Sequence, residues 1–232
     1  MQLIEVSMAG VRSAVITLRA PGTPMRIVLF PMIHAGTPAF YRSVTARLAG
    51  CDLIVAEGIS GRSVVVQALT LAYRLPARSR RLALAVQDID YSSLGVPVIR
   101  PDLTAGQFRA RWRTIPVLQR LAVLGLVPAF ALAFGLLGTR RTLSRYLDTD
   151  DLPTYMEDQA RQVAPQLTEL ILTHRDALLV DSLTTIHQQR QAEAIDVAVV
   201  YGAGHMPALT RELYRRHAYR PSSAEWLTVF DF

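Results

Sequence analysis

Three short apolar runs, each followed by a loop and a helical segment, constrain the fold of this chain more than any other feature. They cover residues 26–30, 52–56 and 194–201 and are rich in Val, Ile, Leu and Ala, as expected of strands buried on both faces. A proline opens the helical segment after the first and the third run, at Pro38 and Pro207. Strands that alternate with helices predict an α/β domain with a mainly parallel central sheet and flanking helices.

Turn and cap signals place the other elements. Residues 3–8 and 11–18 alternate around Ala9-Gly10 and predict an N-terminal β-hairpin at the edge of the sheet. A capping box at Thr104 predicts a helix that continues into an apolar block. We expect one domain over residues 1–232, with an apolar helical insertion at about 115–145. The further predicted elements are helices at 37–50, 60–75, 153–191 and 207–217, and strands at 82–86, 96–99 and 226–230.

Composition excludes several classes of protein. Half of the 232 residues are hydrophobic and 19% are charged, which excludes intrinsic disorder. The net charge of +6 is carried by arginine alone, and the arginine clusters are not interleaved with stacking aromatics, so we expect no nucleic-acid partner. Cys51 is the single cysteine, which excludes a disulfide framework, and it is interpreted as a core thiol. The N-terminus lacks the pattern of a secretory signal, so we expect a cytoplasmic protein.

Two segments far apart in the chain repeat one pattern. Residues 27–34 and 198–205 each form a predicted strand and a short loop that carries one histidine, before a helix opened by proline. His34 and His205 therefore follow the carboxyl ends of strands, and Glu57 holds the same place after the run 52–56. If these strands are parallel neighbours, the three side chains converge at the edge of the sheet where ligand crevices form.

Two neutral imidazoles and a carboxylate are a ligand set that suits Zn, Mn, Co or Fe and leaves positions open for water and substrate. Such a centre generates a metal-bound hydroxide for hydrolysis. Gly202 and Gly204 remove side chains beside His205 and permit close approach of the backbone to a ligand or ion. The alternative is structural: each histidine bonds local backbone, and Glu57 pairs with an arginine. The repeated context favours the functional interpretation.

At these residues the chain resembles the TraB/PrgY/GumN family, whose superfamily includes the Tiki metalloproteases, erythromycin esterase-like proteins and ChaN-like proteins. Residues 202–207 match the family's second G-x-x-H motif, Glu57 its acidic residue, and residues 173–179 its helix motif with Arg175 and Asp176. In the first motif proline stands at position 31 where the family has glycine, and proline fixes φ and removes a donor. The resemblance covers the chain from about residue 26 onward.

The resemblance implies a Tiki/EreA/ChaN-like fold and metal-dependent hydrolysis, with a peptide or small molecule as substrate. It implies a divalent Mn, Co or Zn held by His34, Glu57 and His205, with Gly202 and Gly204 beside the ion. Glu57, Arg175, Asp176 and His205 would be catalytic, and Arg175 would stabilise developing negative charge. A catalytically silent protein that binds a peptide, as in pheromone shutdown, is the alternative function, and a haem-binding relative is a third.

Several polar residues have a simpler interpretation. Asp88, Asp90 and Asp102 lie near predicted strand ends and could add a carboxylate to the site, but most are expected to be turn residues, with Asp102 serving the helix after it. His187 and His217 are expected on solvated helix faces.

The apolar block at 121–138 contains no charge and is flanked by arginines. Its length is at the lower threshold for a membrane span, and Pro128 interrupts it. A complete span would place Glu57 and His205 on opposite sides of a bilayer. The block is therefore expected to be a buried helix, a kinked re-entrant hairpin, an oligomer interface, or a segment that lies on a membrane surface. The surface alternative would make residues 115–138 the contact of a protein peripheral to the inner face of the membrane.

Overall fold

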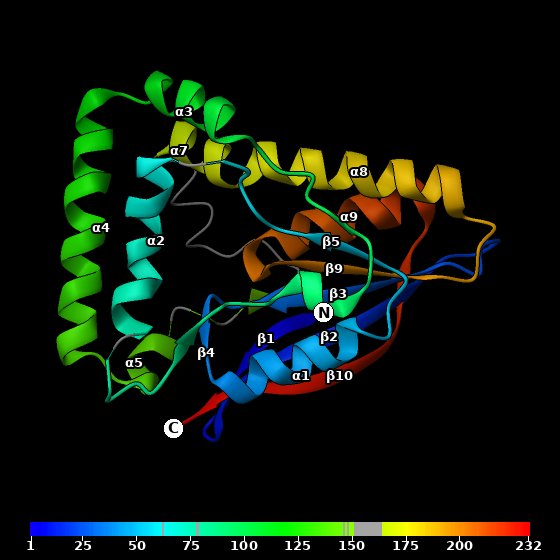
Figure 1. The fold of residues 1–232 in the computed structure, drawn as a ribbon, viewed down its shortest axis with the longest axis horizontal. Helices are drawn as coiled ribbons and strands as arrows, with labels where there is room; N and C mark the ends of the chain where they lie inside the picture. Colours follow the sequence, from blue (N-terminus) through cyan, green and yellow to red (C-terminus); the bar gives the residue numbers. More distant parts are fainter. Residues whose placement is uncertain (62, 78, 146, 148, 151–163) are drawn as a thin grey trace.

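A mixed β-sheet with helices on both faces forms the centre of the computed structural model, which describes residues 1–232 except 62, 78, 146, 148 and 151–163 (Figure 1). The strand order is β7-β5-β9-β3-β2-β1-β8, and β10 also pairs with β2. The strands are β1 (Gln2–Val6), β2 (Gly10–Arg19), β3 (Arg26–Met32), β5 (Leu53–Ala56), β7 (Val98–Ile99), β8 (Thr149–Asp150), β9 (Asp196–Gly202) and β10 (Arg220–Asp231).

The parallel part of the sheet contains the three apolar runs. β9 lies between β3 and β5 and is parallel to both, with Met32 opposite Gly202 and Ala56 opposite Val200. β7 continues the parallel order beyond β5. The carboxyl ends of β3, β5 and β9 therefore meet at one edge, as the sequence predicts for parallel neighbours.

The antiparallel part begins with the predicted hairpin of β1 and β2. The hairpin lies next to the edge of the sheet and does not form it as expected, because β8 pairs with the outer side of β1 and β10 pairs with β2. β10 follows β2 along its whole length, so it is much longer than the predicted strand at 226–230. The last strand of the chain therefore pairs with one of the first strands.

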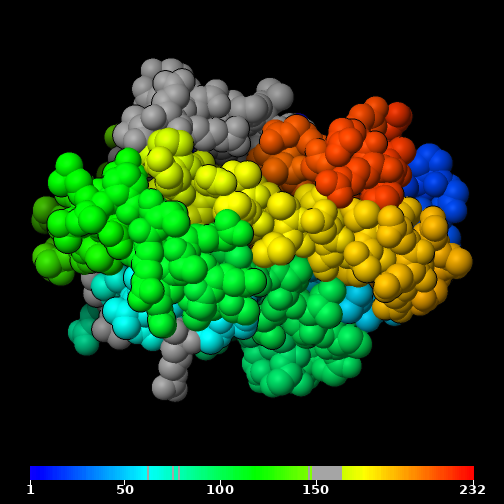
Figure 2. Space-filling model, turned by 90° about the horizontal axis from the view of Figure 1, so that it is seen from above, coloured from blue at the N-terminus to red at the C-terminus, as the bar shows by residue number. Residues whose placement is uncertain are grey.

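Helices α1 (Pro38–Leu48), α8 (His174–Arg190) and α9 (Met206–His217) cover the two faces of the sheet. Thr37 caps α1, because its hydroxyl accepts the backbone N–H of Phe40. The apolar side of α1 packs against one face of the sheet. α8 and α9 pack against the other face and lie side by side in the view of Figure 2.

Beyond the carboxyl edge of the parallel strands lies a helical layer of α2 (Val64–Ala77), α3 (Ala105–Thr114), α4 (Val117–Leu137) and α5 (Arg140–Ser144). The capping box at Thr104 opens α3 as predicted. The helix does not run on into the apolar block, because Ile115 is extended before Pro116, and the block forms the separate helix α4. α2 packs along α4, and a satellite core forms beneath α2 and α3.

Three other predictions differ in their boundaries. The helix expected at 60–75 begins at Val64, and the strand expected at 82–86 shortens to β6 (Ala85–Val86), which pairs with β4 (Ala35–Gly36). The start of the helix expected at 153–191 lies outside the described residues. Its described part contains α7 (Pro165–Thr168) and a π-helical turn at Glu169–Thr173 that leads directly into α8. Turns of this kind are frequent at functional sites, and this one precedes Arg175.

Candidate active site

The loops after β3, β5 and β9 bring His34, Glu57 and His205 together around Gly202. A Cβ atom at Gly202 would lie 3.3 Å from Glu57 Oε2, 3.7 Å from His205 Cδ2 and 3.8 Å from His34 Nε2. The backbone N–H of Gly202 donates to Glu57 Oε2 at 2.7 Å. The absence of a side chain at Gly202 therefore creates the space that the three groups share. Apart from its chain neighbours Ala203 and His205, a Cβ at Gly204 would have only Leu172 within 4 Å among the described residues, so this second glycine does not border Glu57 or His34.

Both histidine rings are oriented through their Nδ1 atoms. His34 Nδ1 lies 3.1 Å from the amide oxygen of Gln87, and His205 Nδ1 lies 2.6 Å from Asp176 Oδ1. Each acceptor requires a proton on Nδ1, which directs Nε2 of the ring toward the space beside Gly202. His34 Nε2 has no hydrogen-bond partner among the residues that the structure describes. His34 therefore presents an unused acceptor nitrogen.

Arg175 stands at the centre of a buried ion cluster. Its Nε and Nη2 donate to the two oxygens of Asp102 at 2.9 and 2.7 Å, and Nη2 also donates to Glu57 Oε1 at 2.5 Å. Its Nη1 has only longer contacts, 3.4 Å to the carbonyl oxygen of Ile171 and 3.3 Å to His205 Nε2. The guanidinium is thus fixed on one side and keeps donor capacity on the other.

Asp102 has a different role from the predicted one, because the sequence analysis favoured a turn residue at the start of the next helix. Its side chain is 0% exposed and forms a bidentate pair with Arg175. It also accepts the backbone N–H groups of Gly58 and Leu103. The carboxylate therefore anchors the cluster to the loop after β5.

Burial and opposite charges act against each other on the pKa values of this cluster. Burial disfavours the ionised form of Glu57, but the neighbouring His205 and Arg175 outweigh it and hold the carboxyl pKa far below its usual range. Burial likewise opposes protonation of His205, but Asp176 and Glu57 raise its pKa to about 9. Arg175 has a raised pKa, because Asp102 and Glu57 overcome its burial. At neutral pH the cluster therefore contains ionised Glu57, Arg175 and protonated His205.

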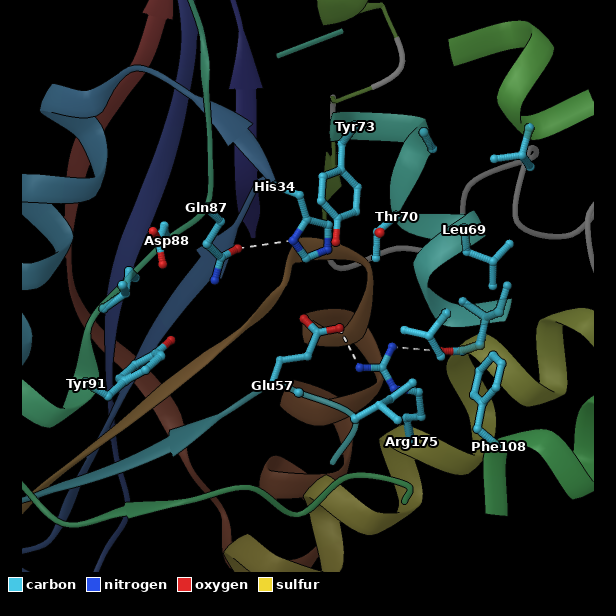
Figure 3. A pocket seen from close by; sticks show the side chains of 17 residues that line it. His34, Glu57, Leu69, Thr70, Tyr73, Gln87, Asp88, Tyr91, Phe108 and Arg175 are labelled. Carbon is cyan, nitrogen blue, oxygen red and sulfur yellow. Dashed lines mark hydrogen bonds and ion pairs between the residues drawn. The ribbon is translucent and has the colours of Figure 1, made fainter. Parts of the chain in front are cut away.

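A cavity of about 550 Å³ opens over this cluster (Figure 3). His34, Glu57 and Arg175 line its polar floor, whereas His205, only 4% exposed, is not among its lining residues. The apolar wall comes from α2, α3, α4 and the π-helical turn, and includes Val66, Leu69, Phe108, Val127 and Ile171. The cavity therefore accepts a molecule that has both a polar group and an apolar part.

Two residues of the site were missed by the sequence analysis. Tyr73 of α2 stacks on the His34 ring with 4.8 Å between centroids, and burial raises the pKa of its hydroxyl. Gln87 orients His34 and follows the predicted strand at 82–86, so the rule that located Glu57 would have found it. No comparable signal existed for Tyr73, because its position depends on how α2 packs.

The proposed ligand set fits a divalent metal in residue type and in ring orientation. Glu57 Oε1 and His205 Nε2 are 3.7 Å apart, and two atoms bound to one metal at about 2.1 Å each can be up to about 4.2 Å apart. However, the guanidinium of Arg175 already contacts both atoms, and His205 is protonated at neutral pH. Among the described residues, no three His, Cys, Asp or Glu side chains form a group that could hold a metal ion as they stand.

Two residues outside the site also differ from or refine their predictions. His187 was expected on a solvated face but is buried, with Nδ1 3.1 Å from the hydroxyl of Tyr219 and its ring 4.2 Å from that of His217. Cys51 is partly buried, and burial raises the pKa of its thiol to about 11.

Comparison with known proteins adds no identification. No protein family, no curated protein and no solved structure matches this chain.

Proposed function

We propose that the cavity is the active site of a hydrolase that cleaves a peptide or a small carbonyl compound. The observation that carries the proposal is His34 Nε2, an oriented acceptor without a protein partner in the described chain, at the floor of a cavity that also exposes Arg175. A general base needs a free acceptor near the attacking water, and a hydrolytic transition state needs a cation near the developing oxyanion.

His34 would take the proton from a water molecule whose oxygen forms the new bond to the substrate carbonyl carbon. Nη1 of Arg175 has only long contacts and would stabilise the oxyanion. The bond to the leaving group then breaks, and His34 returns the proton to that group. Glu57 and Asp102 would position Arg175, and Asp176 would position His205, so the carboxylates act through the cations.

A metal-dependent form of the same hydrolase is the second candidate, favoured by the ring orientation that directs both Nε2 atoms to one space. His34, Glu57 and His205 would hold the Mn, Co or Zn ion. The ion would supply a Lewis acid and a water of lowered pKa. In this form His205 must lose a proton and Arg175 must release Glu57 Oε1, so binding the metal would release a proton. We also propose that the fold is of the Tiki/EreA/ChaN-like type, as the resemblance to the TraB/PrgY/GumN family implies.

The proposal is tested by assaying the purified chain on a panel of aryl esters and peptides. The activity is measured after treatment with a chelator and again after Mn, Co or Zn is added. The variant His34→Gln should lower kcat by at least about 100-fold, the usual contribution of a general base. The matched control His217→Gln, at the end of α9 and outside the cavity, should leave kcat unchanged.

The same assays distinguish the two candidates. Activity that survives chelation supports the metal-free form, and activity that returns only with metal supports the second candidate. Full activity in His34→Gln would refute both. Peptide binding without turnover would favour the silent peptide-binding protein instead.

A further inference from the structure

Helix α4 is the outermost element of the helical layer (Figure 1). It presents a broad apolar face to solvent. One side of α4 packs along α2, and Ala131 is its fully buried residue. The other side exposes a series of large side chains, with Leu126 at 68% and Phe130 at 57%. The further exposed apolar residues of α4 are Val117, Leu118, Leu121, Leu124, Leu132, Leu136 and Leu137. Exposed apolar surface of this extent marks an interaction site.

The charged side chains in the stretch of chain that contains α4 have one sign. From Leu103 to Leu147 the chain contains seven arginines and no Asp or Glu. Three of the arginines belong to α3, at one end of α4, and three lie in or next to α5, at the other end. The seven are Arg109, Arg111, Arg113, Arg120, Arg140, Arg141 and Arg145. An uncharged face between two basic ends matches hydrocarbon bordered by anionic headgroups.

The fold excludes a complete crossing of the bilayer by α4 alone. Among the described residues, α4 is the one helix long and apolar enough to span a membrane by length and composition. However, β5 precedes it in the chain, β9 follows it, and these two strands are hydrogen-bonded neighbours in one sheet. Both ends of α4 therefore return to the same side, and in contact with a bilayer the helix would lie along its surface.

A second copy of this chain is a poorer partner for the same face. A symmetric contact between two α4 helices would bring the arginine-rich ends of one copy against those of the other, and like charges across an interface are unfavourable. Anionic phospholipid instead neutralises these arginines. We propose that α4 docks the domain on an anionic phospholipid bilayer, with its apolar face at the boundary between headgroups and acyl chains. Because Val127 of the same helix lines the cavity, docking brings the cavity close to the lipid.

Flotation of the purified full chain with vesicles tests the proposal. Vesicles of phosphatidylcholine mixed with phosphatidylglycerol should bind the protein, pure phosphatidylcholine should bind it at least about tenfold more weakly, and added salt should weaken the binding. The double variant Leu126→Glu with Phe130→Glu should reduce binding at least about tenfold, because it places charge in the apolar face. Arg109→Gln with Arg145→Gln should lower the preference for the anionic vesicles.

Tyr214→Glu is the matched control, because Tyr214 is 53% exposed on α9, which lies well apart from α4 in Figure 1. It should bind like the unaltered chain, and circular dichroism should confirm that every variant is folded. Absence of binding to anionic vesicles would overturn the proposal, and so would unchanged binding of the α4 double variant. A dimer in light scattering that dissociates in that variant would assign the face to self-association instead. None of these readouts depends on the hydrolase activity.

Discussion

Replacing Asp102 with asparagine should remove a large part of the stability of this domain. The Asp102 side chain is 0% exposed, holds Arg175 through two hydrogen bonds of 2.9 and 2.7 Å and accepts two backbone N–H groups. Breaking a buried ion pair by removing one partner costs about 3–5 kcal/mol. Arg175 keeps Glu57 as a second carboxylate partner, so we expect the lower end, about 3 kcal/mol. That is a large fraction of the roughly 5–15 kcal/mol by which domains are stable.

Urea denaturation followed by circular dichroism measures this loss as a lower midpoint at an unchanged slope. Glu193→Gln is the control, because its pair with Arg190 is exposed to solvent and such pairs contribute little to stability. The cost of Asp102→Asn should also fall by at least about 1 kcal/mol when Arg175 is already glutamine, because the two residues are in direct contact. A loss no larger than that of the control, or equal losses in both backgrounds, would refute a buried pair at this position.

Three further predictions concern single residues. Gly202→Ala should lower the free energy of unfolding by about 1–3 kcal/mol, because the new Cβ would press on Glu57 Oε2. Gly204→Ala introduces only an ordinary contact and should cost much less, and urea denaturation of both variants measures the difference. At pH 8 alkylation of Cys51 should be about 100-fold slower in the folded than in the unfolded chain, because its pKa rises from 9.0 to about 11; equal rates would contradict the burial of the thiol. Burial and the neighbouring His217 lower the pKa of His187 from 6.5, so the unfolded chain binds this proton more readily than the folded chain. Stability therefore falls as the pH drops through 6.5. In thermal melts the variant His187→Gln should lose less stability between about pH 7 and pH 5 than the unaltered chain.

Local rules were sufficient to locate the three site loops. An apolar run followed by a histidine or glutamate and a helix signal predicts a buried strand and a polar carboxyl end, and this describes His34, Glu57 and His205. Their convergence needed only that the three strands be parallel neighbours, which the order β5-β9-β3 provides. The hairpin and the caps of α1 and α3 also follow from short-range signals, since a cap bonds groups only three residues away.

Long-range packing decided what the local rules could not. Asp102 sits 73 residues before Arg175, and no pattern near either residue shows that they pair. His187 stands in a stretch of polar helix and is nevertheless buried, because Tyr219 and His217 lie over it. The two-residue break between α3 and α4 follows from Pro116, but the side of α4 that faces solvent depends on where α2 lies.

The sequence by itself determined an α/β domain in which His34, Glu57 and His205 each follow a buried strand, together with an uncharged apolar block flanked by arginines. The tertiary structure decided the roles of those groups. It placed Arg175 between Glu57 and His205, buried His205 behind the cavity and left His34 Nε2 without a partner in the described chain. The physical reason is range: backbone preferences and hydrophobic periodicity act over a few residues, whereas charge pairing and burial depend on which distant segments the fold brings into contact.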